Sequence, residues 1–288
     1  MMRLRTALAP LLLSLIAAAP LVAQAEETGV FVYSAWLVTD DGRNGAVYLT
    51  IENTLDVAVE LTGAATPFGD VMLSPMDAEM PTIAPGETFT LTPDSAALYV
   101  TSADDAPNLD DGLTLTLTFE DSAGSLYDAT TGALPADAAP EPGDVVVLAG
   151  WARPTALDEA DVGDPAEVIS GAYLTLENRG DEANALVSLS SPRVGVVELH
   201  ETQMDDGMMR MRPLAALPLE PGEQHALAPG GEHLMLIDLE SHLLPGQVVP
   251  LTLTFESGQT LTVAVPVRDE RDATEPEAEA TESHADHH

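Results

Sequence analysis

Two segments of the sequence alternate leucine or phenylalanine with threonine, and both read Leu-Thr-Leu-Thr-Phe-Glu, at 115–120 and 251–256. Successive side chains of a β-strand point to opposite faces, so this pattern predicts a strand with one buried face. Other short apolar runs are separated by Pro-Gly, Gly-Gly or Asp-Gly turns, as in sandwiches and barrels. No segment shows a long helical period, so we expect an all-β protein.

Two further segments recur in the same order. One pair is 45–53 and 171–178, and the other is Pro-Gly-Glu at 85–87 and 221–223. The offset grows from 125 (Tyr48 to Tyr173) to 136 (Pro85 to Pro221). Such ordered self-similarity indicates a duplication, with an insertion in the second copy. We therefore predict two tandem antiparallel β-sandwich domains.

The ends of the chain and the segment between the copies differ in composition from the rest. Arg3 and Arg5 precede an apolar stretch and a small-x-small pattern, Ala-Gln-Ala, at 23–25. These features indicate a cleaved secretory signal peptide, and the prolines in the stretch disfavour an uncleaved anchor helix. The predicted organisation is a signal peptide (1–25), a first β-domain (26–133), a Pro/Ala linker (134–144), a second β-domain (145–268) and a disordered acidic tail (269–288).

Charge and cysteine content exclude several functions. Ten arginines, with no lysine, stand against 48 acidic residues, for a net charge of −38. Such a surface disfavours nucleic acid as a partner, because nucleic acid binding requires basic groups. The acidic residues are spread along the chain, which favours adaptation to salt over a dock for basic partners. The sequence has no cysteine, which excludes zinc-thiolate, iron–sulfur and blue-copper sites.

Methionine and histidine gather in the second copy, where five of the ten methionines lie between 204 and 235. If Asp206-Gly207 forms a two-residue hairpin turn, residue 202 faces 211 and residue 204 faces 209. One face of this hairpin then carries His200, Thr202, Met204, Met209 and Met211. His233 and Met235 lie two residues apart, so they also share a face. A sandwich could bring the two groups together.

His200, Met211, His233 and Met235 would form a soft, uncharged ligand set. Thioether sulfur selects Cu(I) and is a poor ligand for Zn(II), Mg(II) or Ca(II). Taken singly, a methionine on a strand usually packs in a core. The combination of two imidazoles and two thioethers nevertheless indicates a Cu(I) carrier site.

The spacing of these four residues, His-x10-Met-x21-His-x-Met, resembles the signature of the PCu(A)C family of periplasmic copper chaperones. Flanking segments agree: Trp-Ala-Arg-Pro at 151–154, Glu-Leu-His-Glu-Thr at 198–202 and Met-Arg-Met-Arg-Pro at 209–213. The resemblance covers 145–268 and implies a cupredoxin-like sandwich that binds one Cu(I) through the four side chains. It also implies a non-enzymatic role in the periplasm. The partners would be a copper-accepting subunit of respiratory cytochrome oxidase and thiol-bearing assembly factors.

The first copy departs from this signature. Alignment of the copies sets Pro75 opposite His200, Ala97 opposite His233 and Tyr99 opposite Met235. The first copy has no histidine, so we expect a degenerate domain without metal ligands, kept as a scaffold or docking surface. For its methionines, Met72, Met76 and Met80, packing is favoured over a weak thioether cluster.

Several other residues are candidates for lesser roles. Met204 is a possible accessory ligand, with packing as the alternative. Trp36 and Trp151 are predicted to be core residues, and His225 and His242 to be surface residues. In the tail, His284, His287 and His288 lie close to the acidic residues Glu282 and Asp286. Imidazoles beside carboxylates can bind Cu(II), so a second, weaker Cu(II) site is weighed there against a plain solvated tail.

Two other functions compete with that of a copper chaperone. A periplasmic buffer or docking module would hold copper without directed transfer, and the sequence does not separate it from a chaperone. A copper enzyme or electron-transfer protein is disfavoured, because a blue-copper site needs a cysteine thiolate.

Overall fold

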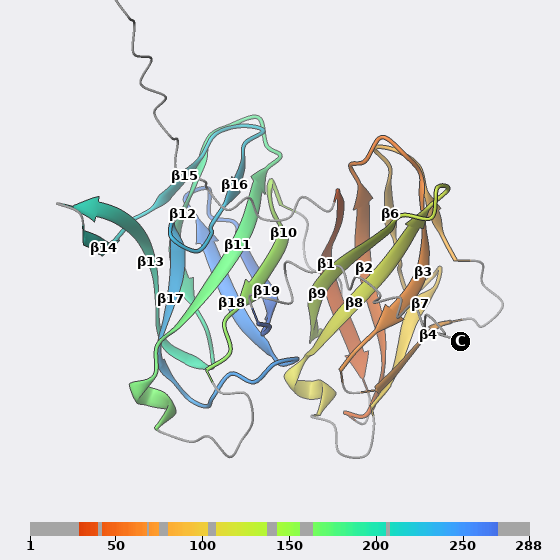
Figure 1. The fold of residues 1–288 in the computed structure, drawn as a ribbon, viewed down its shortest axis with the longest axis horizontal. Coiled ribbons are helices and arrows are strands. Elements are labelled where there is room, and N and C mark those ends of the chain that lie inside the picture. Colours follow the sequence, from red (N-terminus) through yellow and green to blue (C-terminus); the bar gives the residue numbers. More distant parts are fainter. Residues whose placement is uncertain are drawn as a thin grey trace, which may run out of the picture.

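The computed structural model describes residues 29–39, 42–67, 69–74, 80–102, 108–136, 143–155, 164–205 and 208–269. These ranges consist almost entirely of strands, and their helical segments are two short 3-10 turns, Leu109–Asp111 and Pro165–Glu167. No helix in them has the length and apolarity needed to span a bilayer. The expected signal peptide and the three tail histidines lie outside the described residues. The prediction of an all-β protein with tandem sandwiches is confirmed (Figure 1).

The first half forms one continuous sheet that curls over its own core. Its described strands are β1 (Val30–Thr39), β2 (Asn44–Asn53), β3 (Val59–Ala65), β4 (Gly69–Ser74), β5 (Thr82–Ile83), β6 (Thr88–Thr90), β7 (Ala97–Ser102), β8 (Leu113–Asp121) and β9 (Leu126–Pro135). Their order is β4-β7-β2-β1-β9-β8-β3-β5, with β6 beside β2. A short parallel pairing of β1 with β9 joins the two layers.

The second half forms two facing sheets. Its strands are β10 (Val145–Ala152), β11 (Ser170–Asn178), β12 (Asn184–Ser190), β13 (Val194–Asp205), β14 (Met208–Pro213), β15 (Leu217–Leu219), β16 (Gln224–Ala226), β17 (His233–Leu239), β18 (Val248–Phe255) and β19 (Thr260–Pro266). One sheet has the order β10-β11-β17-β13-β14, with β16 beside β11, and the other has the order β15-β12-β18-β19. The β13–β14 hairpin extends away from the body of the sandwich (Figure 1).

Each half has its own hydrophobic core, and the alternating segments supply part of it. Phe119 and Phe255 are fully buried at equivalent positions of β8 and β18, together with the leucines that alternate before them. Trp36 is buried as expected. Trp151 is only half-buried, which corrects the prediction of a core residue: it packs against Tyr173 with a ring separation of 4.5 Å.

A buried asparagine closes one loop in each half in the same way. The side-chain amide of Asn53 donates to the carbonyls of Val57 (2.8 Å) and Ile83 (3.0 Å). Asn178 donates to Glu182 (2.9 Å) and Leu219 (3.0 Å). Both asparagines are fully buried, where an unpaired amide would be costly. The two halves therefore share a structural device as well as a strand order.

The two halves pack against each other through β1 and β9 of the first and β10 and β19 of the second. A Cβ on Gly132 would lie 2.5 Å from the carbonyl oxygen of Ala264, so the backbones meet closely there. Thr114 Oγ1 donates to the carbonyl of Gln247 at 3.1 Å. Strand β9 ends at Pro135, and 137–142 of the expected linker lie outside the described residues.

Arg179 reaches from the second half to the first. Its guanidinium pairs with Glu52 and Glu177 and donates to the Tyr33 hydroxyl at 2.9 Å. Partial burial acts to lower the pKa of Arg179, but the hydrogen bonds to Glu177, Glu52 and Tyr33 outweigh it and raise that pKa. Burial is also the main cause that raises the pKa of the Tyr33 hydroxyl. The arginine therefore stays charged and bridges the halves.

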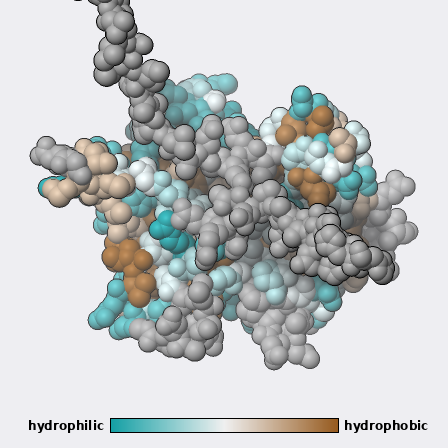
Figure 2. All heavy atoms as spheres, viewed as in Figure 1, coloured by the Kyte–Doolittle hydropathy of each residue, from teal (hydrophilic) through white to brown (hydrophobic). Residues whose placement is uncertain are grey.

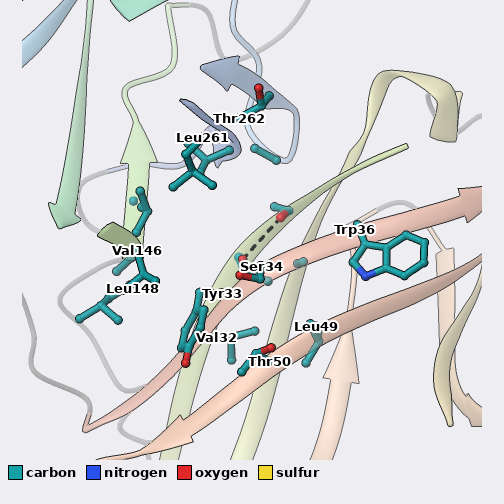
Figure 3. Close-up of a pocket in the computed structure, with 18 of the residues that line it drawn as sticks. Val32, Tyr33, Ser34, Trp36, Leu49, Thr50, Val146, Leu148, Leu261 and Thr262 are labelled. Atoms are coloured by element: carbon teal, nitrogen blue, oxygen red, sulfur yellow. Dashed lines mark hydrogen bonds between the residues drawn. The ribbon is translucent and has the colours of Figure 1, made fainter. Parts of the chain in front are cut away.

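A cavity of about 420 Å³ lies between the halves (Figure 3). Its lining includes Val32 and Leu49 from the first half and Val146, Leu148 and Leu261 from the second. The predicted copper ligands do not line it. The candidate metal centre lies instead on the outer face of the sheet that contains β13 and β17.

Candidate metal centre

Strands β17, β13 and β14 bring the four predicted ligands onto neighbouring positions. His200 on β13 pairs directly with His233 on β17, while Glu198 pairs with Met235. On the other side of β13, Thr202 pairs with Met211, which confirms the predicted hairpin register. Paired residues point to the same face of a sheet. His200 is therefore directly opposite His233 and diagonal to both methionines.

Each of the two imidazoles has one nitrogen hydrogen-bonded to a protein acceptor. His233 Nδ1 lies 3.0 Å from the carbonyl oxygen of Gly231, so it is the protonated nitrogen and donates. His200 Nε2 lies 2.8 Å from a carboxylate oxygen of Glu198. The ring centroids are 6.1 Å apart. When the ring is neutral and the bonded nitrogen carries the proton, the lone pair lies on Nε2 in His233 and on Nδ1 in His200.

His200 Nδ1 is buried and has no hydrogen-bond partner among the described residues. Buried polar atoms are normally paired, so an orphaned acceptor requires an explanation. Metal-binding histidines commonly donate one N–H to a carboxylate or carbonyl and bind the metal with the other nitrogen. Both imidazoles match that arrangement, so the residues present fit a metal that imidazole and thioether can bind.

The methionines of the hairpin are exposed. The exposed fractions are 70% for Met204, 63% for Met209 and 61% for Met211. Figure 2 shows the hairpin projecting from the body as a pale brown arm. Met235 is half-buried and His233 is buried. Of the predicted ligands, Met211 is therefore open to solvent and His233 is covered.

Sequence reasoning missed Glu198 as part of this face. It lies two residues before His200, which places both on one face of β13, and its carboxylate accepts from His200. The two-residue spacing of Glu198 and His200 could therefore have placed Glu198 on the ligand face from the sequence alone. Sequence reasoning likewise missed the Trp151–Tyr173 pair, which shares the face: Tyr173 follows Gly171 by two residues, and Gly171 pairs with Met235.

The other described histidines lie in separate surroundings. His225 is half-buried, and its Nε2 lies 2.5 Å from a carboxylate oxygen of Glu232. His242 Nδ1 lies 3.2 Å from Thr155 Oγ1. Within the described ranges, no group of three or more His, Cys, Asp or Glu side chains is placed to hold a metal ion.

The first half presents different residues at the equivalent positions. Ser74 on β4 pairs with Ala97 on β7 as His200 pairs with His233. The sequence alignment had set Pro75 opposite His200, so the structure moves that equivalence by one residue. Tyr99 takes the position of Met235, since it pairs with Ala46 as Met235 pairs with Gly171. Met72 is exposed on β4, Met80 packs against the core, and Met76 is outside the described residues.

Protein-family comparison matches most of the described chain to one family. The family model described as "Putative lipoprotein LpqE-like" matches residues 30–129 and 145–267. "Putative lipoprotein Lxx21020" of Leifsonia xyli is 34% identical over 108 residues, which are 37% of this chain and 65% of that protein. "Uncharacterized protein RP573" of Rickettsia prowazekii is 32% identical over 135 residues, which are 46% of this chain and 69% of that protein. The chain thus spans about two thirds of either relative.

Solved structures similar to part of the chain include two PCuAC domains and the protein DR1885. The apo PCuAC domain from PmoF1 is 23% identical and covers 45% of this chain and 98% of its own, with a TM-score of 0.36. The copper-bound PCuAC domain from PmoF2 is 21% identical, with coverages of 46% and 99% and a TM-score of 0.35. Apo-DR1885 from Deinococcus radiodurans is 27% identical, with coverages of 46% and 85% and a TM-score of 0.36.

Proposed function

The chain belongs to the LpqE-like family, and from that premise we propose that it is an exported, non-enzymatic copper carrier. In this proposal the second half binds one Cu(I) through His200, Met211, His233 and Met235. The first half has no metal site and acts as a scaffold or docking surface. The proposed compartment is the periplasm, reached through the signal peptide at 1–25.

The observation that carries the proposal is the state of the two imidazoles. Each has one nitrogen hydrogen-bonded to a protein acceptor, Glu198 for His200 and Gly231 for His233, and the other free to bind a metal. The buried, unpaired Nδ1 of His200 has no other role among the described residues. Bound metal would satisfy this atom and offset the cost of burying it.

The chemistry of the ligand set favours Cu(I). Thioethers select soft ions, and two neutral imidazoles with two thioethers add no charge to a monovalent ion. Without a thiolate, the set also withstands an oxidising compartment, where cysteines tend to pair. The exposed Met211 leaves the site open on the β14 side, where an acceptor could approach.

Delivery would occur by ligand exchange, with copper remaining Cu(I) throughout. Thiolates bind this ion more tightly than thioethers do, so thiol-bearing assembly factors can withdraw it. We propose a copper-accepting subunit of respiratory cytochrome oxidase as the final recipient. The alternative is a buffer, which holds copper without directed transfer.

An anaerobic Cu(I) titration of the mature protein against a chromophoric chelator tests the binding site. A chain truncated after Arg268 should also bind one tight equivalent, whereas Met211→Leu should bind it far more weakly. Met208→Leu is the matched control, since it lies on the opposite face of the same strand. The site assignment fails if the wild-type protein binds no tight equivalent, or if both leucine variants bind like the wild type.

Transfer kinetics separate a chaperone from a buffer. The copper-loaded protein is mixed with an apo copper domain of an oxidase subunit, and copper arrival is followed over time. Directed transfer should be faster than spontaneous dissociation into a chelator allows, and its rate should rise with acceptor concentration. A rate equal to that of dissociation would support the buffer.

For the tail, we propose a weaker Cu(II) site formed by His284, His287 and His288. Imidazoles with neighbouring carboxylates are suitable Cu(II) ligands. Deleting 284–288 should remove one Cu(II) equivalent in an aerobic titration and leave Cu(I) binding unchanged. If the Cu(II) stoichiometry does not change, the tail has no such site.

A further inference from the structure

The β13–β14 hairpin presents three methionines to water on one face, Met204, Met209 and Met211, which we call the methionine face. Methionine is normally found packed in a core, where its flexible side chain fills gaps. Here all three side chains are exposed, so core packing does not explain them. The hairpin projects from the sandwich (Figures 1 and 2). The role of these side chains must therefore involve something outside the core.

The register places the three sulfurs within reach of one another. Met204 pairs directly with Met209, and Met211 lies two residues further along β14 on the same face. Directly paired side chains have Cβ atoms about 4.5–5.5 Å apart, and diagonal neighbours are somewhat further apart. Methionine side chains are long and flexible, so three thioethers at this spacing can converge on one ion.

We propose that the methionine face is a second, outer Cu(I) site, formed by three thioethers, through which copper enters and leaves the inner site. This inference rests on the proposed function, because Met211 belongs to both ligand sets. The outer site also contains Met204 and Met209, each of which binds copper directly through its sulfur. Met208 is excluded, since it alternates to the opposite face of β14.

The transfer step is an exchange of ligands without any redox change. Copper held by Met204, Met209 and Met211 keeps its bond to Met211. The lone pairs of His200, His233 and Met235 bind the ion as the sulfurs of Met204 and Met209 leave. His200 is diagonal to Met211 and directly opposite His233, so the ion moves along one continuous face. Release reverses the order.

The same three side chains could instead form an apolar patch that docks a partner. The two roles require different chemistry. Docking requires apolar surface, which leucine supplies as well as methionine does. Copper binding requires sulfur, which leucine lacks. The Met204→Leu/Met209→Leu double variant keeps the volume and apolar character of the face while removing two thioethers. It therefore separates the two roles.

The experiment uses the full mature chain loaded with one equivalent of Cu(I) under anaerobic conditions. Stopped-flow mixing with a water-soluble Cu(I) chelator gives the rate of release, and competition titration gives the affinity. In the double variant, release should slow about tenfold, while the affinity for the first equivalent stays within about twofold. Met208→Leu should match the wild type in both. An unchanged release rate in the double variant would overturn the outer site in favour of a docking patch.

A second measurement distinguishes failure of the outer site from failure of the proposed function. Methionine methyl groups are labelled with carbon-13 and followed by NMR as Ag(I), a redox-inert substitute for Cu(I), is added. The first equivalent should shift Met211 and Met235, and further ion should shift Met204 and Met209 but not Met208. If only the Met211 and Met235 signals shift, the outer site is rejected. If the Met211 and Met235 signals do not shift, the inner site is rejected as well.

Discussion

The same sheet edge is built differently in the two halves of this protein. In the second half β13 continues past His200 and returns as β14, whereas in the first half β4 ends at Ser74. The offset between equivalent positions is 126 at Ser74 and His200 but 136 at Ile83 and Leu219, so ten residues are added between them. The insertion inferred from the sequence is therefore the methionine hairpin.

The contacts that stabilise each sandwich from within are alike in the two halves. Asn53 and Asn178, both fully buried, make equivalent pairs of hydrogen bonds. A tryptophan packs against a tyrosine in each half, at 4.7 Å in the first and 4.5 Å in the second. Scaffold and candidate site are thus separable, because the asparagines and the aromatic pairs recur in both halves while the candidate histidine and methionine ligands occur only in the second.

One pair of variants tests whether only the second half has a site. Met235→Leu removes a proposed thioether ligand. It should lower Cu(I) affinity by more than about 100-fold, the upper end of the loss caused by removing a residue that only hydrogen-bonds to a ligand. Tyr99→Leu alters the equivalent position of the first half and should leave the affinity unchanged. Competition titration of both variants makes the comparison. An equal loss in both would mean that the effect is structural.

The two equivalent asparagines, Asn53 and Asn178, provide a second pair of matched variants. Asn53→Ala and Asn178→Ala each remove two side-chain hydrogen bonds, one of them buried, so each should lower the free energy of unfolding by about 3 kcal/mol. Urea unfolding followed by circular dichroism gives both values. Because the two networks are equivalent, losses that differ by more than about 1 kcal/mol would contradict the idea of a common scaffold.

A graft tests whether the insertion is essential. The triple variant Ser74→His/Ala97→His/Tyr99→Met gives the first half three of the four ligands but no hairpin methionine. It should bind an additional Cu(I), at least about 100-fold more weakly than the native site, because the fourth ligand is missing. Isothermal titration under anaerobic conditions resolves the two classes of site. Equal affinities would show that the hairpin adds nothing to binding.

Glu198 has a smaller effect, as a positioning residue. Glu198→Gln keeps an oxygen acceptor for His200 Nε2 but removes its charge, so Cu(I) affinity should fall about tenfold. Glu201→Gln, one residue from His200 on the opposite face, is the control and should bind like the wild type. X-ray absorption at the copper edge should show the same ligands in all three proteins. A change of ligand set in Glu198→Gln would mean that Glu198 itself binds the metal.

The smallest expected effect concerns the contact between the halves. Arg179→Gln removes the partly exposed ion pair with Glu52 and should lower the free energy of unfolding by about 1 kcal/mol, less at high salt. Arg193→Gln is a suitable control, because Arg193 bonds to Ser241 and Val248 within the second half. Small-angle scattering should show a larger radius for Arg179→Gln only. Equal radii would mean that the interface is held by packing around Gly132.

Local patterns were sufficient for much of this protein. Alternation predicted the strands, and the Asp-Gly turn predicted the hairpin register, because both depend on residues close in the chain. Where neighbouring strands are far apart in sequence, prediction was weaker. Trp151 is half-buried and not a core residue, and Ser74 rather than Pro75 occupies the position equivalent to His200.

The sequence by itself determined the all-β class and the internal repeat, and it supplied the set of candidate soft ligands, since composition and spacing carry that information directly. Only the tertiary structure decided that His200 lies beside His233, that Glu198 pairs with His200 and that His233 is buried while Met211 is not. These features depend on the pairing of β13 with β17, residues about 33 apart in the chain at His200 and His233. Such pairing is set by packing of the whole sandwich, and no local pattern encodes it.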